Sequence, residues 1–384
     1  MNQSECLTVQ QIQAEAESLG FFLCGVSKPD PTPFFDHFQN WVGRGLHAGM
    51  SYLARPDTLA RRANPQEMLP GACTLISLAI PYPPASQAPD SPIPSGGGRV
   101  ASYAWGLDYH DILPPLLEQL VEKLGEIGKP FRYKIFTDSA PLLERGFAAK
   151  AGLGWIGKNS CLIHPRLGSY FLLAEILTDL DLKLVSPVIT DHCGTCTRCL
   201  DACPTGCIRA DRTLDSARCI SYLTIENKTA IPANLQPLLG DWVFGCDICQ
   251  EVCPWNQAFA PLALSNPFQS HPSGAWVDLA QELQQPERVF VEKYQGRPIA
   301  RTRHTGWLRN CLVAAGNCSS PALQPLLVDH LLHNSVPMLR IQAGQALHRH
   351  PSPQAVELLS QALAAEPDAE VQLALQNLLN ALSG

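Results

Sequence analysis

Two cysteine motifs that lie close together constrain the fold and chemistry of this chain more than any other feature. The first has the spacing C-x2-C-x2-C-x3-C-P and the second has the spacing C-x2-C-x3-C-P. The first spacing is typical of chains that hold two [4Fe–4S] clusters, in which the fourth cysteine of a run ligates the other cluster. Zinc sites and disulfides are the alternatives, but zinc usually takes two C-x2-C pairs and does not require the longer run.

This sharing of cysteines between the two runs predicts the ligands of each cluster. The expected ligands of the first cluster are Cys193, Cys196, Cys199 and Cys253, and those of the second are Cys203, Cys246 and Cys249. The second set is one ligand short, and Cys219 in the segment ARCISYL is the expected fourth, with Cys207 as the alternative. Two clusters this close can carry electrons but rarely break bonds in organic substrates alone. We therefore expect a reductase with a second redox centre upstream of the clusters.

Composition restricts the class of protein and its compartment. The chain has 384 residues, of which 46% are hydrophobic and 16% charged, which suits two or three soluble globular domains. Nine of the 15 cysteines lie within residues 193–253, which favours metal binding in a reducing compartment.

The first 20 residues lack the basic and apolar regions of a secretion signal, and no apolar run is long enough to cross a membrane. We therefore expect a cytoplasmic protein without a membrane partner. With a net charge of −7, a nucleic acid would have to meet a local basic patch.

The pattern along the chain predicts an α/β domain, a ferredoxin-type domain and a helical domain. Strands alternate with helices over residues 1–185, the two-cluster domain spans 186–260, and a basic linker spans 261–305. Residues 306–384 read as helices separated by short turns, with prolines at intervals of about 16 residues that favour a HEAT-like stack. An ordinary helical bundle is the alternative. The expected helices are 306–316, 321–333, 336–348, 352–364 and 368–382.

Asp138 is the candidate catalytic acid. It follows an expected strand at residues 131–136 and precedes a helix that we expect to open at Pro141. Open α/β sheets bind their ligands at this end of their strands. A desolvated carboxyl group there would hold a proton near neutral pH and could deliver it to a substrate. The alternative is that Asp138 is only an N-cap of the following helix.

Two further stretches are candidates for contacts with a cofactor. The glycine-rich segment 151–162 surrounds Lys158 and would let a cofactor approach the backbone, although a tight turn explains the glycines equally well. Arg55, Arg61 and Arg62 could hold phosphate or amide groups, and the alternative is that they form the exposed face of a helix.

A basic stretch near the start of the helical domain is the candidate for phosphate binding. Residues 293–309 read KYQGRPIARTRHTGWLR and contain no acidic residue, and Trp307 could stack on a base. Lys228 lies in the loop after Cys219. The alternative is a solvated basic loop. The candidate phosphate contacts are Lys228, Arg297, Arg301, Arg303 and Arg309.

Taken together, these segments resemble the epoxyqueuosine reductase family over nearly the whole chain. The resemblance rests on SYAWGLDYH, FTDSAPLLERGFAAKAGLGWIGKNSCL, GSYFLLAEI, the cluster cysteines with RCISYLT between them, GCDICQEVCPWN and the helical tail. It implies a cobalamin enzyme with two [4Fe–4S] clusters that reduces epoxyqueuosine to queuosine in the anticodon loop of tRNA. Cobalamin follows from this resemblance alone, because the D-x-H-x-x-G signature of the commoner cobalamin fold is absent.

The resemblance also implies roles for particular residues and partners. Asp138 matches the proton donor of the family, and the expected cobalamin contacts are Arg61, Lys158, Ser221, Cys246 and Asp247. We expect a monomer that binds a tRNA anticodon stem-loop and receives electrons from a donor such as a flavodoxin or a ferredoxin. Three alternatives remain at this level. They are a reductive dehalogenase, a ferredoxin-type electron carrier fused to a helical interaction module, and a helical scaffold with structural clusters.

Overall fold

The computed structural model describes residues 7–83, 95–182, 186–257, 274–318 and 320–383. The chain forms two compact units that alternate along the sequence. Unit 1 consists of Met1–Gln87, Leu107–Ala217 and Ile248–Gln269, and unit 2 consists of Ala88–Gly106, Arg218–Asp247 and Ser270–Gly384. The expected domain boundaries at residues 185 and 260 lie outside the described residues. The cluster segment contributes residues to both units.

Unit 1 is built on a four-stranded sheet with the order β1-β2-β7-β4, in which every neighbouring pair is antiparallel. The strands are β1 (Leu23–Ser27), β2 (Thr74–Pro81), β4 (Tyr133–Phe136) and β7 (Phe171–Thr178). Asp138 follows the carboxyl end of β4 as expected, but the rule for ligand binding in open α/β sheets does not apply to this antiparallel sheet. Strand direction depends on the pairing of distant segments, which the local sequence pattern does not contain.

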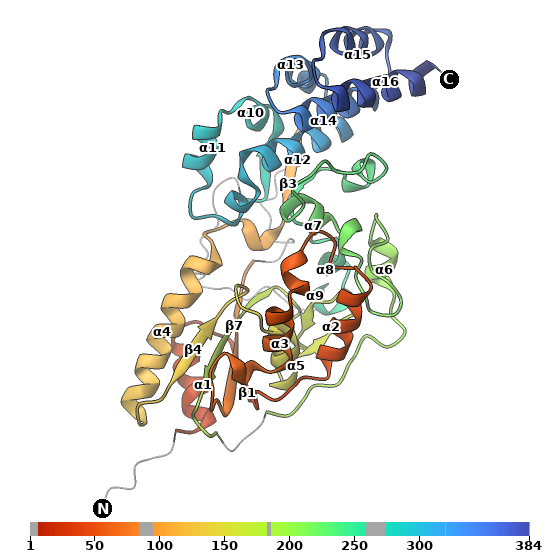
Figure 1. Ribbon diagram of the computed structural model, residues 1–384. Helices are drawn as coiled ribbons and strands as arrows, with labels where there is room; N and C mark the ends of the chain where they lie inside the picture. The colour runs from red at the N-terminus through yellow and green to blue at the C-terminus, as the bar shows by residue number, and fades with distance from the viewer. Residues whose placement is uncertain (1–6, 84–94, 183–185, 258–273, 319, 384) are drawn as a thin grey trace, which may run out of the picture. The chain divides into compact units, whose positions relative to one another are not determined.

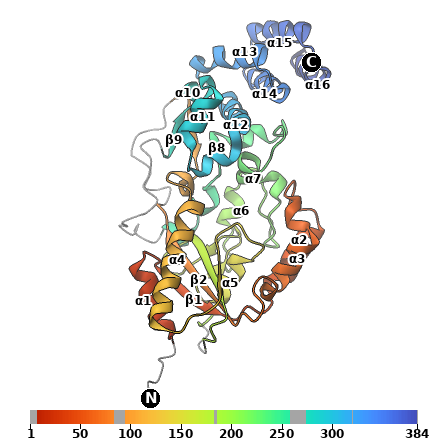
Figure 2. The ribbon, with the colours of Figure 1, turned by 60° about the vertical axis from the view of Figure 1, so that its left-hand side comes forward.

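The two faces of this sheet carry different helices (Figure 2). Helices α1 (Val9–Ser18) and α4 (Tyr109–Ile127) pack on the face that carries Ile76 and Ile176, and the leucines of α4 at spacings of three and four point to it. Helix α5 (Glu144–Lys150) packs on the opposite face, where its Phe147 meets Leu75 and Leu177. The other elements of unit 1 are α2 (Phe34–Gly43), α3 (Pro56–Ala63), β5 (Trp155–Ile156), β6 (Leu162–Ile163), α6 (Arg198–Ala202), α8 (Ile248–Glu251) and α9 (Pro254–Gln257).

Unit 2 combines a small sheet with a helical region. The sheet has the order β8-β3-β9 and consists of β3 (Gly97–Val100), β8 (Trp242–Phe244) and β9 (Trp276–Asp278). Its helices are α7 (Ile220–Ile225), α10 (Leu279–Gln284), α11 (Glu287–Tyr294), α12 (Arg303–Asn317), α13 (Gln324–His333), α14 (Pro337–His348), α15 (Pro353–Ala365) and α16 (Ala369–Ser383). One apolar core runs from Phe244 through Trp307 to Leu375, so the sheet and these helices fold as one body (Figure 1).

The predicted helices of residues 306–384 are confirmed as α12 to α16, with ends within a few residues of those expected. Pro337 and Pro353 each occupy the first position of a helix, where the missing N–H is not needed. Pro321 opens a 3-10 turn, Pro321–Leu323, and α13 begins at the next residue. Of the described helices, none is long and apolar enough to span a membrane.

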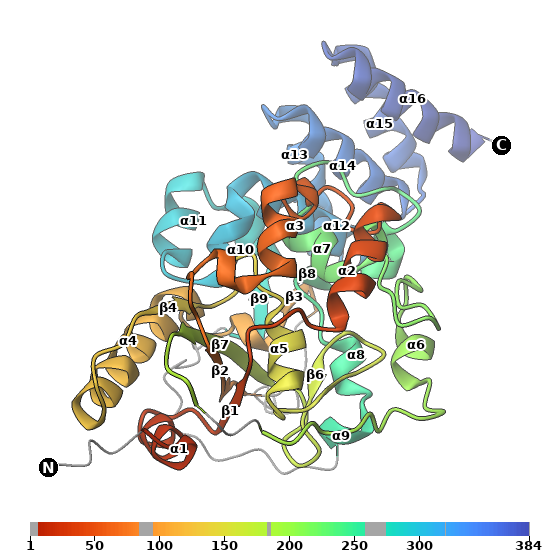
Figure 3. The same cartoon turned by 60° about the horizontal axis from the view of Figure 1, so that its bottom comes forward.

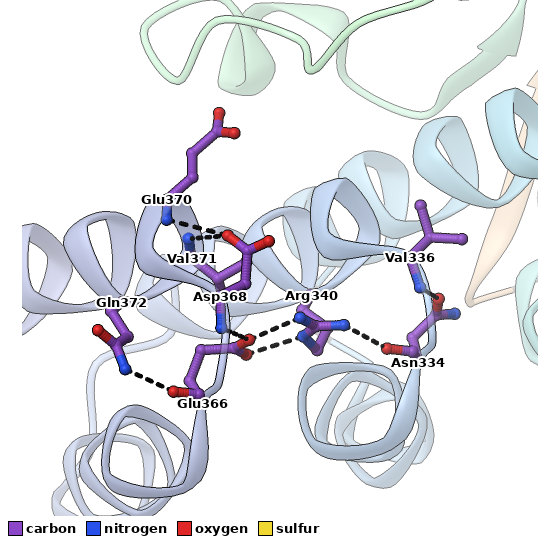
Figure 4. A network of polar contacts seen from close by, with 8 residues as sticks. All are labelled: Asn334, Val336, Arg340, Glu366, Asp368, Glu370, Val371 and Gln372. Atoms are coloured by element: carbon purple, nitrogen blue, oxygen red, sulfur yellow. Dashed lines mark hydrogen bonds and ion pairs between the residues drawn. The ribbon is translucent and has the colours of Figure 1, made fainter.

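A buried ion pair joins the loops of this helical region (Figure 4). The Arg340 guanidinium on α14 donates to both carboxylate oxygens of Glu366, at 2.8 and 2.6 Å, and to the carbonyl oxygen of Asn334 at 2.8 Å. Glu366 also accepts from the backbone N–H of Asp368. Both side chains of the pair are at most 10% exposed, so the pair fixes the turns before α14 and α16 against each other.

Candidate active site and cluster ligands

Asp138 lies on a strained turn directly after β4. Its φ of 53° is in the left-handed region, which a residue with a side chain seldom adopts. Two short hydrogen bonds hold this conformation. The Asp138 N–H donates to Glu144 Oε1 at 2.6 Å, and the Ser139 N–H donates to the Thr137 carbonyl oxygen at 2.6 Å. Strain of this kind persists only where the surroundings enforce it, and it concentrates at functional sites.

The Asp138 carboxylate is held from one side by α4. The Tyr109 hydroxyl donates to Asp138 Oδ2 at 2.8 Å, and His110 Nε2 lies 3.8 Å from the same oxygen. His110 Nδ1 lies 2.8 Å from Asp108 Oδ1, and the Tyr109 and His110 rings stack. The carboxylate is thus oriented by a phenol and an imidazole that the N-terminal turn of α4 places together.

The structure excludes the N-cap alternative for Asp138. Helix α5 begins at Glu144 rather than at Pro141, and its N-cap is Leu143, which makes no capping bond through its side chain. The described residues do not desolvate Asp138, because its side chain is 57% exposed. Two other carboxyl groups lie in this region: that of Glu175 is fully buried, and Glu144 is half-buried. Sequence reasoning missed both, although a single glutamate in the apolar run SYFLLAEIL was a signal.

Burial gives these two carboxyl groups unusual proton affinity. Burial first, and then the charge of Asp138, raise the pKa of Glu144 to about 8, although Arg145 and Arg62 act in the opposite direction. Burial also raises the pKa of Glu175 well above its ordinary value, with smaller contributions from the charges of Glu144 and Asp138. Both carboxyl groups therefore bind a proton more tightly than an exposed glutamate does.

The four predicted ligands of the first cluster gather in unit 1. Burial raises the pKa of the Cys199 thiol to about 11, with further contributions from the charges of Cys193, Cys253 and Cys196, which are therefore close to it. The Trp155 indole N–H lies 3.5 Å from Cys193 Sγ, and the Trp155 ring meets those of His192 and Trp255 edge-on. Four thiols beside an aromatic shell fit a [4Fe–4S] cluster. The described residues include no group of three or more His, Cys, Asp or Glu side chains placed for a single metal ion.

The glycine-rich segment 151–162 folds against its own unit. A Cβ on Gly152 would lie 2.4 Å from the Pro187 carbonyl oxygen, and one on Gly154 would lie 2.2 Å from that of Ile163. Both glycines are therefore required by backbone packing. Lys158 donates to the carbonyl oxygens of Gly194 and Cys196, at 2.8 Å each, and so supports the cysteine turn. Its contact with a cofactor stays a prediction.

The predicted ligands of the second cluster are divided between the units. Cys203 and Cys249 belong to unit 1, whereas Cys219 and Cys246 belong to unit 2, with Cys219 as the N-cap of α7. Cys207 is buried, and its Sγ lies 3.4 Å from that of Cys203. The alternative that Cys207 is a ligand therefore has a local contact in its favour.

The predicted cobalamin contacts are likewise divided between the units. Arg61 is exposed at the end of α3 in unit 1. In unit 2, Ser221 is half-buried on α7, and Asp247 is buried and accepts the Ser102 N–H at 2.7 Å through Oδ2.

Arg62, the neighbour of Arg61 on α3, has buried polar atoms without a partner in the part of the chain that the structure describes. Its Nε and Nη1 are buried and have no hydrogen-bond partner among the described residues, and its guanidinium lies over the Phe38 ring.

Comparison with known proteins gives a consistent result. Two family models match: one described as a 4Fe-4S double cluster binding domain over residues 192–256, and one described as Epoxyqueuosine reductase QueG, DUF1730 over residues 62–139. The epoxyqueuosine reductase of Xanthomonas campestris is 39% identical over 345 residues, which cover 88% of this chain and 95% of that protein. The Escherichia coli enzyme is 38% identical and covers 84% of this chain and 87% of its own length. This chain belongs to the epoxyqueuosine reductase family.

Solved structures of epoxyqueuosine reductases have the same fold. One contains an epoxyqueuosine-modified stem loop of tyrosine tRNA, and it matches 98% of each chain with a TM-score of 0.89 at 30% identity. Another, from Bacillus subtilis, is described as having a catalytic loop, named by an aspartate, swung out of the active site. It matches 97% of this chain and 98% of its own with a TM-score of 0.87 at 29% identity.

The basic residues predicted to meet RNA in this family member differ in exposure. Lys228, Arg301 and Arg303 are exposed, and Arg297 is half-buried. Lys228 donates to the Ile225 and Arg301 carbonyl oxygens. Burial lowers its pKa, and the nearby charges of Arg309, Arg301 and Arg303 lower it further against the opposing charge of Glu226. These exposed cations form one group within unit 2.

Arg309 and Trp307 are corrections to the predicted RNA contacts. Arg309 is only 1% exposed, and its guanidinium donates to the carbonyl oxygens of Leu223, Asn227 and Thr229. Trp307 is fully buried, with its indole N–H on Glu282 Oε2 at 2.7 Å, so it has no free face for a base. Both residues lie on α12, whose residues from Trp307 to Gly316 are all buried. The apolar run in this helix was the sequence signal that it is buried.

Proposed function

We propose that this protein reduces epoxyqueuosine in tRNA to queuosine. The observation that carries the proposal is the likeness, over 98% of each chain, to an epoxyqueuosine reductase solved with an epoxyqueuosine-modified tRNA stem loop. The proposal is also supported by the two cysteine runs and by Asp138 on its strained turn. Conversion of the epoxide to the alkene consumes two electrons and two protons and releases water.

Two [4Fe–4S] clusters would carry the electrons. We assign Cys193, Cys196, Cys199 and Cys253 to the first cluster and Cys203, Cys219, Cys246 and Cys249 to the second. The thiols grouped around Cys199 support the first assignment. The second follows the crossed pattern of two-cluster ferredoxins, with Cys219 preferred to Cys207. The electrons would come from a low-potential protein such as a flavodoxin or a ferredoxin.

Cobalamin is the proposed second redox centre, and it would supply low-valent cobalt to reduce the epoxide carbon when bound. Its contacts would be Arg61, Lys158, Ser221, Cys246 and Asp247. Arg62 supports the fit, because its buried Nε and Nη1 have no acceptor in the described part of the chain. Such donors require an acceptor, and the amide side chains of a corrinoid offer carbonyl oxygens.

In this proposal Asp138 protonates the oxygen as it leaves the substrate carbon. Tyr109 orients the carboxyl group through Oδ2, and the Glu144 hydrogen bond to the Asp138 N–H holds the left-handed turn. The swung-out loop of the Bacillus subtilis relative supports a role for this turn as a movable catalytic loop. The exposure of the Asp138 side chain suits an acid that must reach a nucleotide substrate.

The RNA partner would be an anticodon stem-loop carrying epoxyqueuosine. It would be bound by a HEAT-like stack of α12 to α16 and by a basic group made of Lys228, Arg297, Arg301 and Arg303. The members of this basic group would contact phosphates, since each of these cations is partly or fully exposed. We further propose that the protein acts as a monomer in the cytoplasm.

The test is anaerobic reconstitution with iron, sulfide and cobalamin, followed by incubation with epoxyqueuosine-containing tRNA and a chemical reductant. We expect mass spectrometry of the digested nucleosides to show queuosine formed only when cobalamin is present. Reconstituted protein with both clusters and bound cobalamin that leaves epoxyqueuosine unchanged would refute the proposed function.

A further inference from the structure

The reaction requires more protons than Asp138 can store. Reduction of the epoxide to the alkene and water takes up two protons, and one carboxyl group delivers one. The Asp138 side chain is also 57% exposed among the described residues. A second acid that is close to Asp138 and protonated at neutral pH would supply what is missing.

Glu144 has the position that such an acid needs. It is the first residue of α5, and its Oε1 accepts the backbone N–H of Asp138 at 2.6 Å, so its carboxyl group lies against the residue that it would serve. Proton transfer between two carboxyl groups requires that they come within hydrogen-bond reach, directly or through one water molecule. An N–H donor ordinarily favours the ionised form of a carboxyl group, but burial and the charge of Asp138 outweigh it, and the pKa of Glu144 rises to about 8.

Beneath Glu144, the sheet carries a buried carboxyl group and a buried hydroxyl group. Helix α5 covers the face of β2 and β7 on which Glu175 and Ser77 lie opposite each other in the strand register (Figure 3). Glu175 and Ser77 are fully buried, and neither Glu175 oxygen nor the Ser77 hydroxyl has a hydrogen-bond partner within the described ranges. A buried carboxyl group without donors is stable only when neutral.

The charged groups around Glu144 come from several elements. Asp138 follows β4, Glu175 is on β7, Arg145 is on α5 itself, and Arg62 is on α3. The two arginines favour the ionised form of Glu144, and Asp138 disfavours it. The Arg145 guanidinium donates to the Ser160 carbonyl oxygen, so part of its hydrogen-bonding capacity is used there.

We propose that Glu144 stores the second proton of the reaction and passes it to the Asp138 carboxylate after Asp138 has given up its own. The inference rests on the proposed function of Asp138. Asp138 loses a proton to the leaving oxygen, gains the proton of Glu144, and loses it in turn as the oxygen leaves as water. Glu144 then recovers a proton from solvent, and the two electrons come from the low-potential donor through the clusters. Glu144 acts through Asp138, as a positioning residue that supplies a proton. Glu175 is the buried, neutral carboxyl group beneath it.

The test compares Glu144→Gln with Glu175→Gln and with the exposed surface control Glu126→Gln. The three holoenzymes and the wild type are assayed anaerobically with dithionite on an epoxyqueuosine-containing stem-loop RNA, from about pH 6 to pH 9. We expect wild-type turnover to fall above about pH 8. Glu144→Gln should lose about 100-fold in turnover and lose that alkaline limb, with unchanged iron content and RNA binding. Glu126→Gln should stay near the wild type, because its side chain is exposed on α4.

Infrared spectroscopy supplies a readout that does not depend on turnover. The wild type should show the carbonyl band of protonated carboxyl groups at neutral pH, and each Gln variant of the pair should lose part of it while Glu126→Gln keeps it. Wild-type turnover and pH profile in Glu144→Gln, or absence of the band, would overturn the inference. Inactive wild-type protein with the band present would refute the proposed function instead and leave the stored proton established.

Discussion

At the scale of single residues, the Asp138 turn brings together groups that the sequence separates. Asp138 itself was predictable, because it follows a strand and precedes a helix. Its partners were not, because Tyr109 reaches it from α4 and Glu144 from a helix that begins three residues later than expected. Glu175 stands out in the sequence as a charge in an apolar strand, but its place beneath α5 depends on the register of β2 and β7.

The raised pKa of Glu144 makes a prediction about stability. A carboxyl group that binds its proton more tightly in the folded state stabilises that state at low pH. This contribution is complete below the ordinary pKa of about 4.5 and is lost as pH rises to about 8. We expect the urea midpoint of anaerobic protein to fall between pH 5 and pH 8, and Glu144→Gln to reduce that fall. An identical pH dependence in the variant and the wild type would contradict the account.

At the scale of elements, local patterns predicted helices well and sheet topology poorly. Prolines at first helical positions, together with short turns, predicted the first and last residues of α14 and α15 to within about one residue. The sheet of unit 1 proved antiparallel, since the neighbours of β7 are set by segments about 40 to 100 residues away. Arg309 was misjudged because a positive residue in a basic run reads as exposed, whereas α12 is covered by α7 and α14.

The buried pair of Arg340 and Glu366 allows a direct test of the helical region. Arg340→Met leaves the Glu366 carboxylate buried without its main donor, and we expect a loss of about 3–5 kcal/mol of unfolding free energy. The double variant Arg340→Met/Glu366→Leu should recover much of that loss, because no unpaired charge remains. The exposed pair of Arg288 and Glu292 is the matched control, and Arg288→Met should change stability by less than about 0.5 kcal/mol. Urea unfolding followed by circular dichroism measures all three, and equal effects of Arg340→Met and Arg288→Met would contradict the assignment.

At the scale of the whole molecule, the cysteine motifs predicted the electron-carrying role, and the interleaving of the two units was not foreseen. The cluster segment reads as one compact domain, yet Cys219 and Cys246 belong to unit 2 and the other predicted ligands to unit 1. Cysteine spacing reports only which side chains can reach one cluster. It does not show in which body each turn is anchored.

RNA binding by the basic group should appear as a salt effect. Each lost phosphate contact reduces the slope of log affinity against log salt by about 1. We expect Lys228→Ala and Arg303→Ala each to weaken stem-loop binding with this change of slope, and Arg301→Ala to weaken it more, because Arg301 also neutralises Glu226 at 2.8 Å. Arg288→Ala, which removes an exposed arginine of α11, is the control. Fluorescence anisotropy over a series of salt concentrations measures the affinity and the slope. If a variant with all three alanine substitutions kept the wild-type affinity and slope, these residues would not be the RNA-binding surface.

The most direct test of the central claim compares the wild type with Asp138→Asn on epoxyqueuosine-containing tRNA under anaerobic conditions. Asparagine keeps the size of the side chain and the left-handed preference of the turn but cannot give up a proton. The account predicts that both proteins contain about eight irons and bind cobalamin, and that only the wild type forms queuosine above background in the nucleoside mass spectrum. Queuosine formed by Asp138→Asn at the wild-type rate would contradict the account.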